Sequence, residues 1–487
     1  MKPLPKTYHP AEYTTSRVPA YRNNPLIEAL PPILSRAEAA AKLTLEVPYD
    51  PAIRAEDACI REHALADLNH FFQPLSQHLL LESAISRTLR FGYTGRNPLQ
   101  GEFRADLIRE RNAARERIKS GGNFEPSPNA GHGFSVVGFS GTGKTSAVER
   151  ILEPYKQIIY HDSYQGHPLE CSQLVWLKME CPSKGSVRAL AINFFKAVDD
   201  LFGSKWEKAY AGRTTDELIP HFAFVASLHH LGLLVIDEIQ HLSVKHSGGP
   251  TEMLNFFVEL SNTIKVPMIL IGTEAAIQPL SRQFQMVRRQ SGQGEVLWKP
   301  LSYSEEWSLF AEALWRYQYT SVETELTEQL SATLHYESAG VMSYAVTIYM
   351  LAQTRVIDSG DERITPGLIH AVAQDSLKRS QVFLKAIREG DLDRLVHFTD
   401  LNPISFADLA NREKRRSSRV PKAKHTASQS SAAVDEDPNP TRPRVRDESA
   451  EPIIPQIVAG NTNDGKTAYE RLLDNGLIES GPLSQIS

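Results

Sequence analysis

The chain has 487 residues, 41% of them hydrophobic, and a formal net charge of −5. This length allows roughly two to four domains with real cores, and the mild charge excludes a protein held on DNA or on a membrane by its overall field, so any nucleic-acid surface must be local. The three cysteines have neither metal-ligand spacing nor the even number of a disulfide framework, and neither a signal core nor an apolar run of ~18 residues is present. We therefore expect a cytoplasmic protein without membrane contact.

Residues 1–128 are expected to form an N-terminal docking arm and a helical extension. Residues 1–50 are rich in proline, and residues 18–33 mix aromatic and aliphatic side chains with turn residues. This pattern predicts an arm that docks either on a partner or on the chain's own nucleotide domain. Three helical segments are expected to follow, at 55–69, 75–91 and 107–119. Gly92 is the predicted stop of the second.

Residues 138–145 read Gly-Phe-Ser-Gly-Thr-Gly-Lys-Thr, the G-x-x-x-x-G-K-T pattern of a phosphate-binding P-loop. A short apolar run precedes the motif and helix formers follow it, which favours a P-loop over the alternative of a glycine-rich turn before an ordinary helix. The glycines allow backbone N–H groups to approach phosphate oxygens, the Lys144 ammonium reaches the β- and γ-phosphates, and the Thr145 hydroxyl binds Mg²⁺. We expect ATP and Mg²⁺ as cofactors. The predicted nucleotide-binding residues are Gly138, Phe139, Ser140, Gly141, Thr142, Gly143, Lys144, Thr145 and Ser146.

A second motif, Leu-Leu-Val-Ile-Asp-Glu at 233–238, is typical of a buried parallel strand that ends in acids. Asp237 is placed to hold the Mg²⁺ shell, and Glu238 to orient and polarise the attacking water as the catalytic base. Thr273 ends another apolar run. It is predicted either to sense the γ-phosphate or to cap the next helix.

Strands and helices alternate between residues 129 and 302, which predicts an α/β fold with a parallel sheet flanked by helices. Beyond the two strands already named, strands are expected at 173–179, 266–273 and 295–299, and helices at 186–202, 216–231 and 250–264. Two adjacent arginines, Arg288 and Arg289, precede the last strand. In ring ATPases an arginine from this region acts as a finger on the neighbour's nucleotide, although two adjacent loop arginines are also an ordinary surface feature.

The C-terminal third changes character twice. Residues 303–400 predict a small all-α lid of four or five helices, with an independent helical binding domain as the alternative. Residues 401–460 have the composition of a disordered linker whose basic run either contacts DNA or is solvated. Residues 461–487 regain an apolar helical face and predict a partner-binding peptide, or else a frayed terminal helix.

Several strings resemble the TnsC/TniB family of AAA+ ATPases, which regulate transposition in prokaryotic transposons. The resemblance covers roughly residues 15–400. Its matching strings are 24–32, 72–75, 92–98, the P-loop, 232–242, 252–258, 270–273, Gln353 and 363–368.

The resemblance implies an ATP-dependent ring or filament of identical subunits around duplex DNA. Such a protein links a target-selection protein, here expected at the N-terminal region, to the transposase subunits and an endonuclease partner, here expected at the C-terminal tail. Hydrolysis disassembles the oligomer. Many AAA+ lids carry a sensor arginine, but Gly340–Tyr344 contains none, so no second sensor is expected.

Sequence-independent DNA contacts are expected from basic and hydroxyl residues on pore-facing loops. The candidates are Lys184, Ser186, Arg188 and Lys245, each of which is otherwise an ordinary solvated loop residue. Two rival functions remain open. One is a replication or helicase-loader ATPase, and the other is a nucleotide-switched signalling scaffold that does not bind DNA.

Overall fold

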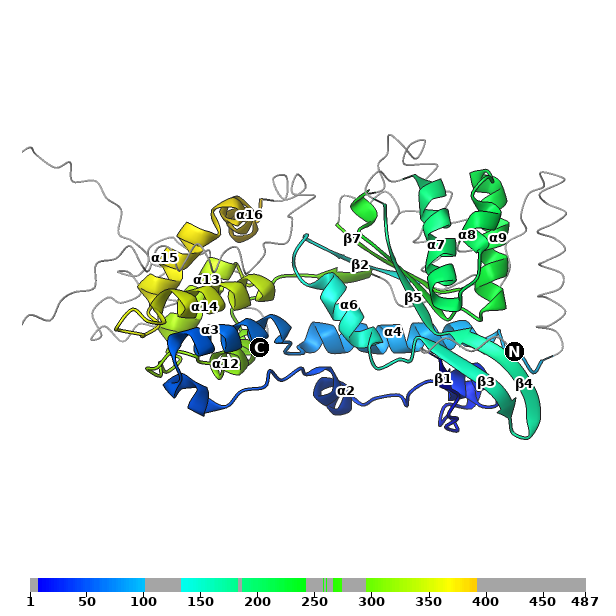
Figure 1. Ribbon diagram of the computed structural model, residues 1–487, viewed down its shortest axis with the longest axis horizontal. Helices are drawn as coiled ribbons and strands as arrows, with labels where there is room; N and C mark the ends of the chain where they lie inside the picture. Colours follow the sequence, from blue (N-terminus) through cyan, green and yellow to red (C-terminus); the bar gives the residue numbers. More distant parts are fainter. Residues whose placement is uncertain are drawn as a thin grey trace, which may run out of the picture. The chain divides into compact units, whose positions relative to one another are not determined.

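A computed structural model of the chain describes residues 8–100, 133–182, 186–241, 257, 260, 266–273 and 295–391, apart from the side chains at 216 and 379 (Figure 1). The contacts discussed below lie within one compact unit, residues 1–326 and 330–419. The helix predicted at 107–119, most of the helix predicted at 250–264, and the tail beyond residue 391 lie outside the described residues.

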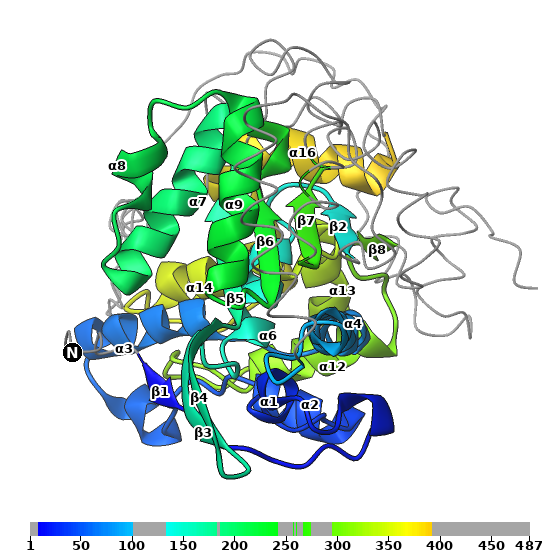
Figure 2. The same cartoon turned by 90° about the vertical axis from the view of Figure 1, so that its right-hand side faces the viewer.

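The centre of the fold is a five-stranded sheet in the order β5-β6-β7-β2-β8, in which every neighbouring pair is parallel. Figure 2 shows β6, β7, β2 and β8 side by side in this order. The strand bounds are β5 Trp176–Glu180, β6 Leu233–Asp237, β7 Met268–Gly272, β2 Phe134–Gly138 and β8 Glu295–Trp298. The predicted parallel α/β fold is confirmed. β7 lies between the strand that enters the P-loop and the strand that ends in Asp237.

Helices cover both faces of the sheet because alternate side chains of each strand point to opposite sides. Leu234 and Ile236 of β6 belong to one core with helices α7 and α9, whereas Leu233 and Val235 belong to a second core with helices α4 and α6. The helix bounds are α4 Ser76–Thr94, α6 Lys144–Leu152, α7 Val187–Phe202, α8 Trp206–Tyr210 and α9 Thr215–Leu228. Burial on both faces explains why β6 reads as an uninterrupted apolar run.

The strand predicted at 173–179 is wrong as a single element. Its first part ends β4 (His167–Leu174), which pairs antiparallel with β3 (Ile158–Tyr164), and a new strand, β5, begins at Trp176. Gln165 and Gly166 connect β3 to β4, both with positive φ (49° and 81°), as a two-residue hairpin turn requires. The short strand β1 (His9–Pro10) extends this hairpin in parallel. The apolar run from Leu174 to Leu177 carries no turn residue that would have revealed the break.

Gly92 does not stop its helix, because α4 continues to Thr94. A Cβ at residue 92 would lie 2.3 Å from Cγ of Pro267, so glycine serves close packing against the residue that precedes β7. The sequence prediction that Gly92 ends the helix is therefore wrong, and the glycine is needed for close packing within the helix.

The N-terminal segment packs on its own nucleotide domain. Leu26 and Ile27, in the short helix α1 (Pro25–Glu28), are buried in the core that contains α4, α6 and β2. Buried hydrogen bonds fix the same segment: Tyr164 Oη donates to Glu28 Oε2 at 2.6 Å, and Gln173 Nε2 donates to the Leu26 carbonyl at 2.8 Å. The remaining elements of this region are η1 Pro19–Tyr21, α2 Arg36–Leu43, η2 Pro51–Ala55, α3 Ala58–Leu65 and η3 Ala66–His70.

The second half of the N-terminal segment packs on the predicted lid. Leu65, Leu68 and Leu75 enter the apolar core of the lid helices. Arg61 also forms a buried ion pair with Glu362 at 2.5 and 2.9 Å. Burial alone would raise the pKa of Glu362, but hydrogen bonds from Arg61 and two backbone N–H groups lower it to about 2. The lid helices are α12 Glu305–Trp315, α13 Glu328–Ser338, α14 Met342–Val356, α15 Pro366–Ser376 and α16 Lys378–Glu389.

No helix among the described residues is both long and apolar enough to cross a membrane.

Candidate nucleotide-binding site

The predicted P-loop connects β2 directly to α6. Gly141 and Gly143 have φ values of 75° and 90°, in the left-handed region that favours glycine. Gly138 is needed for a different reason, because a Cβ there would lie 2.3 Å from the carbonyl oxygen of Trp298 on β8. Ser140 and Thr145 lie within this same turn and first helical residues. These glycine conformations are compatible with a loop whose backbone N–H groups bind phosphate.

The Lys144 ammonium is buried inside the loop. Its Nζ donates to the carbonyl oxygens of Phe139 at 2.6 Å and Gly138 at 3.1 Å. Burial lowers its pKa to about 8, and the nearby charges of Glu238 and Asp237 oppose this shift. A nearby anion stabilises the charged form of a buried ammonium, and the phosphates of a nucleotide are such an anion.

Asp237 ends β6 with a side chain that is 2% exposed. Its Oδ1 accepts a hydrogen bond from the Glu238 backbone N–H at 2.8 Å. Its Oδ2 is buried and accepts no hydrogen bond from the described residues, and the Lys178 ammonium lies 3.4 Å away. A buried carboxylate oxygen with spare capacity fits a role toward Mg²⁺ or its water ligands.

Glu238 has a strained backbone. Its φ of 54° is uncommon for a residue other than glycine, and such strain is often found at functional sites. The carboxylate accepts a hydrogen bond from the Gln240 amide and lies 3.8 Å from His241 Nε2. The side chain is 38% exposed, so water reaches it.

Thr273 follows β7 immediately, at the same carboxyl edge of the sheet. Its hydroxyl is buried and has no hydrogen-bond partner among the described residues. β7 is adjacent to both β2 and β6, so Thr273 lies between the ends of the two motif strands. An orphaned hydroxyl at this place suits contact with a ligand.

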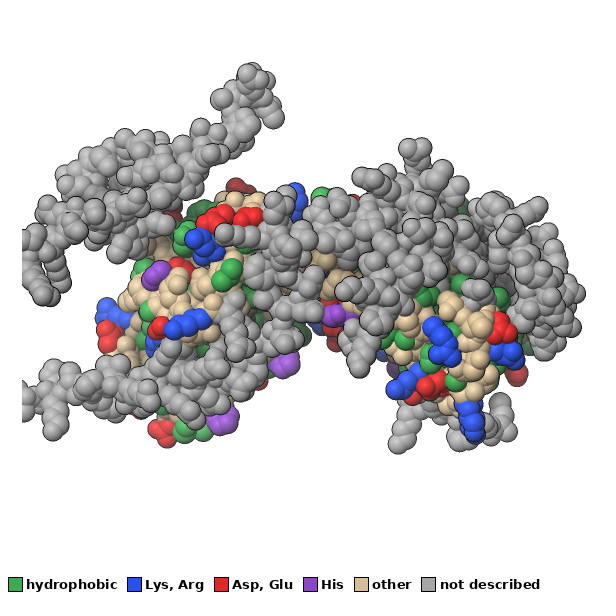
Figure 3. All heavy atoms as spheres, turned by 90° about the horizontal axis from the view of Figure 1, so that it is seen from above, with side chains coloured by type: hydrophobic (Ala, Val, Ile, Leu, Met, Phe, Trp, Pro, Cys, Tyr) green, Lys and Arg blue, Asp and Glu red, His purple; other side chains and the backbone are tan. Residues whose placement is uncertain are grey.

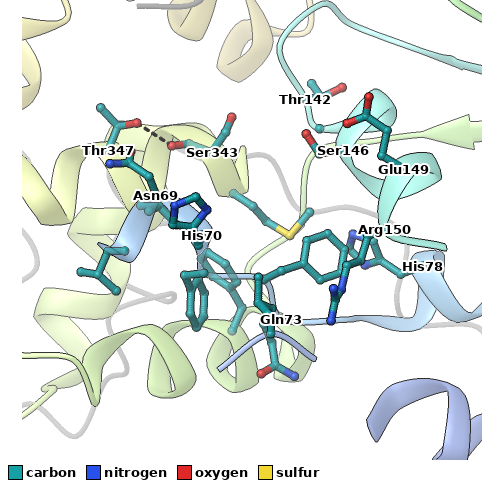
Figure 4. A pocket seen from close by; sticks show the side chains of 18 of the residues that line it. Asn69, His70, Gln73, His78, Thr142, Ser146, Glu149, Arg150, Ser343 and Thr347 are labelled. Carbon is teal, nitrogen blue, oxygen red and sulfur yellow. Dashed lines mark hydrogen bonds between the residues drawn. The ribbon is translucent and has the colours of Figure 1, made fainter. Parts of the chain in front are cut away.

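Beside the P-loop lies a cavity of about 670 Å³ that the sequence analysis did not predict. Figure 4 shows Thr142, Ser146 and Glu149 on one side and Ser343 and Thr347 on the other. Apolar side chains from the N-terminal segment and the lid also line it: Leu45, Leu68, Phe71, Phe72, Phe310, Met342 and Val346. Polar and charged residues complete the lining, among them Asn69, His70, Gln73, His78, Arg150 and Glu153. Its size is that of a small-molecule pocket, and its walls mix apolar with polar side chains.

Trp298 of β8 connects this cavity to the P-loop. Its indole N–H donates to the Thr142 carbonyl at 2.9 Å, and its ring packs edge-on against His78 with 5.1 Å between centroids. Burial lowers the pKa of His78 to about 4, so its imidazole is neutral at pH 7 and its Nδ1 accepts from the Leu75 N–H. In the sequence, Trp298 is recognisable only as an apolar residue in a short predicted strand, so its contacts with Thr142 and His78 could not be predicted.

The lid touches the P-loop at two points. Ser343, in the first turn of α14, donates to the Gly141 carbonyl at 2.9 Å. Phe139 packs edge-on against Phe383 of α16, with ring centroids 6.4 Å apart. Gly340–Tyr344 contains no arginine that could act as a lid sensor. In this segment, Ser343 contacts the P-loop.

Two of the residues predicted to contact DNA, Ser186 and Arg188, form local hydrogen bonds in the described structure. The Ser186 hydroxyl caps α7 by accepting from the Ala189 N–H, and the Arg188 guanidinium donates to the carbonyls of Ala211 and Arg213. On the face shown in Figure 3, the described Lys and Arg side chains are interspersed with Asp and Glu. Four predicted residues lie outside the described part of the chain: Lys184, Lys245, Arg288 and Arg289.

Comparison with known protein families agrees with the parallel α/β fold described above. Residues 130–280 match the family described as AAA domain, so this region is a P-loop NTPase domain of the AAA type. No curated protein matches the chain.

Several solved structures are similar at low identity. They include the Orc1 protein of Aeropyrum pernix in complex with DNA, at 15% identity and TM-score 0.34, covering 66% of this chain and 79% of that one. Cdc6p of Pyrobaculum aerophilum has 13% identity and TM-score 0.32, covering 56% and 66%. A Walker-type ATPase of Pyrococcus abyssi has 16% identity and TM-score 0.33, covering 61% and 77%.

Proposed function

We propose that this chain is a Mg²⁺-dependent ATPase that assembles on duplex DNA in its ATP-bound state and regulates transposition. One observation carries the ATPase assignment. The P-loop, the spare buried oxygen of Asp237 and the orphaned hydroxyl of Thr273 all lie at the carboxyl edge of one parallel sheet, where α/β proteins bind ligands.

Each residue at this edge has a role in hydrolysis. Lys144 would neutralise the β- and γ-phosphates, and Thr145 and Asp237 would hold the metal. When bound, Mg²⁺ supplies positive charge to the phosphate oxygens. Glu238 accepts a proton from the attacking water, and Thr273 contacts that water or the γ-phosphate.

The cavity beside the P-loop accommodates the base and the ribose. Thr142 and Ser146 border it, so it is continuous with the loop that binds the phosphates. Because the N-terminal segment and α14 supply the remaining walls, bound nucleotide contacts both segments. The lid and the N-terminal region would therefore respond to the nucleotide state.

The role in transposition is supported by the resemblance to the TnsC/TniB family. Two of the matching strings, 24–32 and 92–98, belong to segments that contact each other through buried side chains. Asn24 Nδ2 donates to the Tyr93 carbonyl at 2.8 Å, and Asn97 Nδ2 donates to the Asn23 carbonyl at 2.7 Å. The strings that carry the resemblance therefore lie side by side in the fold.

The partners follow from the same resemblance. They are duplex DNA, a target-selection protein at the N-terminal region, and transposase subunits with an endonuclease partner at residues 461–487. A homo-oligomeric ring or filament would bring Arg288 or Arg289 to the neighbour's nucleotide. Lys184 and Lys245, which lie outside the described residues, stay candidates for DNA contact.

Electron microscopy of the full chain with duplex DNA and a non-hydrolysable ATP analogue tests the proposal. We expect rings or filaments on DNA with the parent and none with Lys144→Ala, whereas Lys156→Ala, at an exposed lysine, should assemble like the parent. A parent that remains monomeric and off DNA with the analogue would overturn the assembly proposal.

Two further measurements separate the rivals. DNA-stimulated ATPase activity excludes the signalling scaffold, and capture of a transposase by residues 460–487 excludes the loader.

A further inference from the structure

Lys178 has no role in the site described so far, yet its ammonium lies between two carboxylates. Nζ is 2.7 Å from Glu149 Oε1 and 3.4 Å from Asp237 Oδ2. The Lys178 side chain is 15% exposed and that of Asp237 is 2% exposed, whereas Glu149 is 55% exposed. The ammonium therefore links one carboxylate inside the protein to another at its surface.

The backbone fixes this arrangement. β5 and β6 pair in parallel with Lys178 opposite Val235, so Lys178, Val235 and Asp237 point to the same face of the sheet. Val235 packs in the core that contains α6, so this is the face that α6 covers. Glu149 lies one helical turn after Thr145 on α6, on the same side of that helix.

The ammonium is therefore a neighbour of the proposed metal site. Asp237 is shared by both: it would hold Mg²⁺ together with Thr145, and it contacts Lys178, which also binds Glu149. Without a metal, a carboxylate buried this deeply needs a compensating positive charge. Lys178 supplies this charge at Oδ2, the oxygen that accepts no hydrogen bond.

We propose that Lys178 is a positioning residue that acts as a placeholder cation: it neutralises Asp237 in the metal-free protein and is transferred to Glu149 when Mg²⁺ binds. This inference rests on the proposed nucleotide site. Two cations at one carboxylate oxygen repel each other, so the metal must displace the ammonium, and Glu149 already holds it at hydrogen-bond distance. Lys178 thereby neutralises the empty site and opposes metal binding.

The proposal predicts opposite effects for two substitutions. Lys178→Met removes the competing cation, so the metal should bind about tenfold more tightly, the scale expected for a neighbouring charge. Glu149→Gln weakens the alternative partner of the ammonium, which then stays on Asp237, so the metal should bind several-fold more weakly. A residue with a merely structural role would not separate the two variants in this way.

Mn²⁺ replaces Mg²⁺ in the test because its binding is measured directly by electron paramagnetic resonance. The full chain is titrated with Mn²⁺ in the presence of ADP, and the Tm is measured with and without Mn²⁺ and ADP. For Lys178→Met we expect a lower Tm without ligand but a parent-like Tm with it. Lys178→Arg should restore parent behaviour because it keeps the charge. Lys208→Met, at an exposed lysine on α8, is the matched control. If the methionine variant does not fold, Lys178→Gln replaces it.

Three results would overturn the proposal alone: unchanged or weaker Mn²⁺ affinity in Lys178→Met or its Gln substitute, equal loss of Tm with and without ligand, or shifts of the same sign in the Lys178 and Glu149 variants. Absence of ADP-dependent Mn²⁺ binding by the parent chain would instead overturn the proposed function, and this inference with it.

Discussion

The two ends of the proposed nucleotide site are built in different ways. The phosphate end comes from one continuous loop and the ends of two neighbouring strands. The base end is assembled from side chains of the N-terminal segment, α6, α12 and α14, which are far apart in sequence. Phosphate chemistry demands specific residue types at fixed spacing, whereas an apolar wall accepts many side chains of suitable size. Only the phosphate end, whose chemistry restricts the residue types, therefore leaves a pattern that can be recognised in the sequence.

The largest expected effect is at the phosphate end, where one substitution should reduce ATP hydrolysis but leave nucleotide affinity nearly unchanged. Glu238→Gln should reduce ATP hydrolysis by about 10³-fold, because general-base catalysis contributes roughly 10²–10⁴-fold. Nucleotide affinity should remain within a few-fold of the parent, and the oligomer should persist on DNA. Steady-state phosphate release and titration with a fluorescent ATP analogue measure the two quantities. Hydrolysis at the parent rate would show that Glu238 is not the base.

The next effect concerns His78 at the base end. Its folded-state pKa of about 4 lies below the ordinary value of 6.5, so the unfolded chain binds the proton more readily between these values. The free energy of unfolding should therefore fall as pH drops from about 6.5 to 4, by about 3 kcal/mol from this residue. Burial also lowers the pKa values of His229, to about 4, and His230, to about 3, so these residues add to the slope.

Urea denaturation across this pH range, with His78→Asn beside the parent, isolates the contribution of His78. The asparagine oxygen replaces Nδ1 as the acceptor for the Leu75 N–H but does not titrate in this range. A slope identical to that of the parent would show that His78 is not buried in neutral form.

A third substitution tests whether the two ends are separable. Val346→Trp should fill part of the cavity and weaken ATP binding by about tenfold, the cost of a modest steric loss. The affinity for inorganic tripolyphosphate, which needs only the P-loop, should not change. Competition titrations against a fluorescent nucleotide compare the two ligands. Leu309→Trp, at a residue that is 52% exposed on α12, is the control. Equal weakening for both ligands would mean that the cavity does not hold the base.

The smallest expected effect lies at the connection between the two ends. Trp298→Phe keeps most of the ring packing but removes the N–H that donates to the Thr142 carbonyl. Loss of one buried hydrogen bond should lower the free energy of unfolding by about 1–2 kcal/mol and weaken nucleotide binding a few-fold. Urea denaturation and nucleotide titration measure these changes, and no change in either would separate Trp298 from the P-loop.

Much of the fold was predictable because apolar runs and helix formers alternate at regular spacing. The parallel sheet and the strand that ends in Asp237 followed from this pattern. The break at Val175 was not predictable, because a continuous apolar run serves equally well for one long strand or two short ones. The packing role of Gly92 depends on Pro267, which is remote in sequence. The cavity and the contact between Lys178 and Asp237 likewise exist only once the chain has folded.

The division of the N-terminal segment between two cores has a mechanical consequence. Among the buried core residues that the structure describes, the chain crosses between the core of the nucleotide domain and that of the lid in three places: between Leu43 and Val47, between Leu75 and Leu81, and between Trp298 and Leu301. Three short connections tie the two cores together more closely than a single linker would. A fragment that begins at residue 129 loses two of these connections and part of each core, so we expect it to be less stable than the full chain.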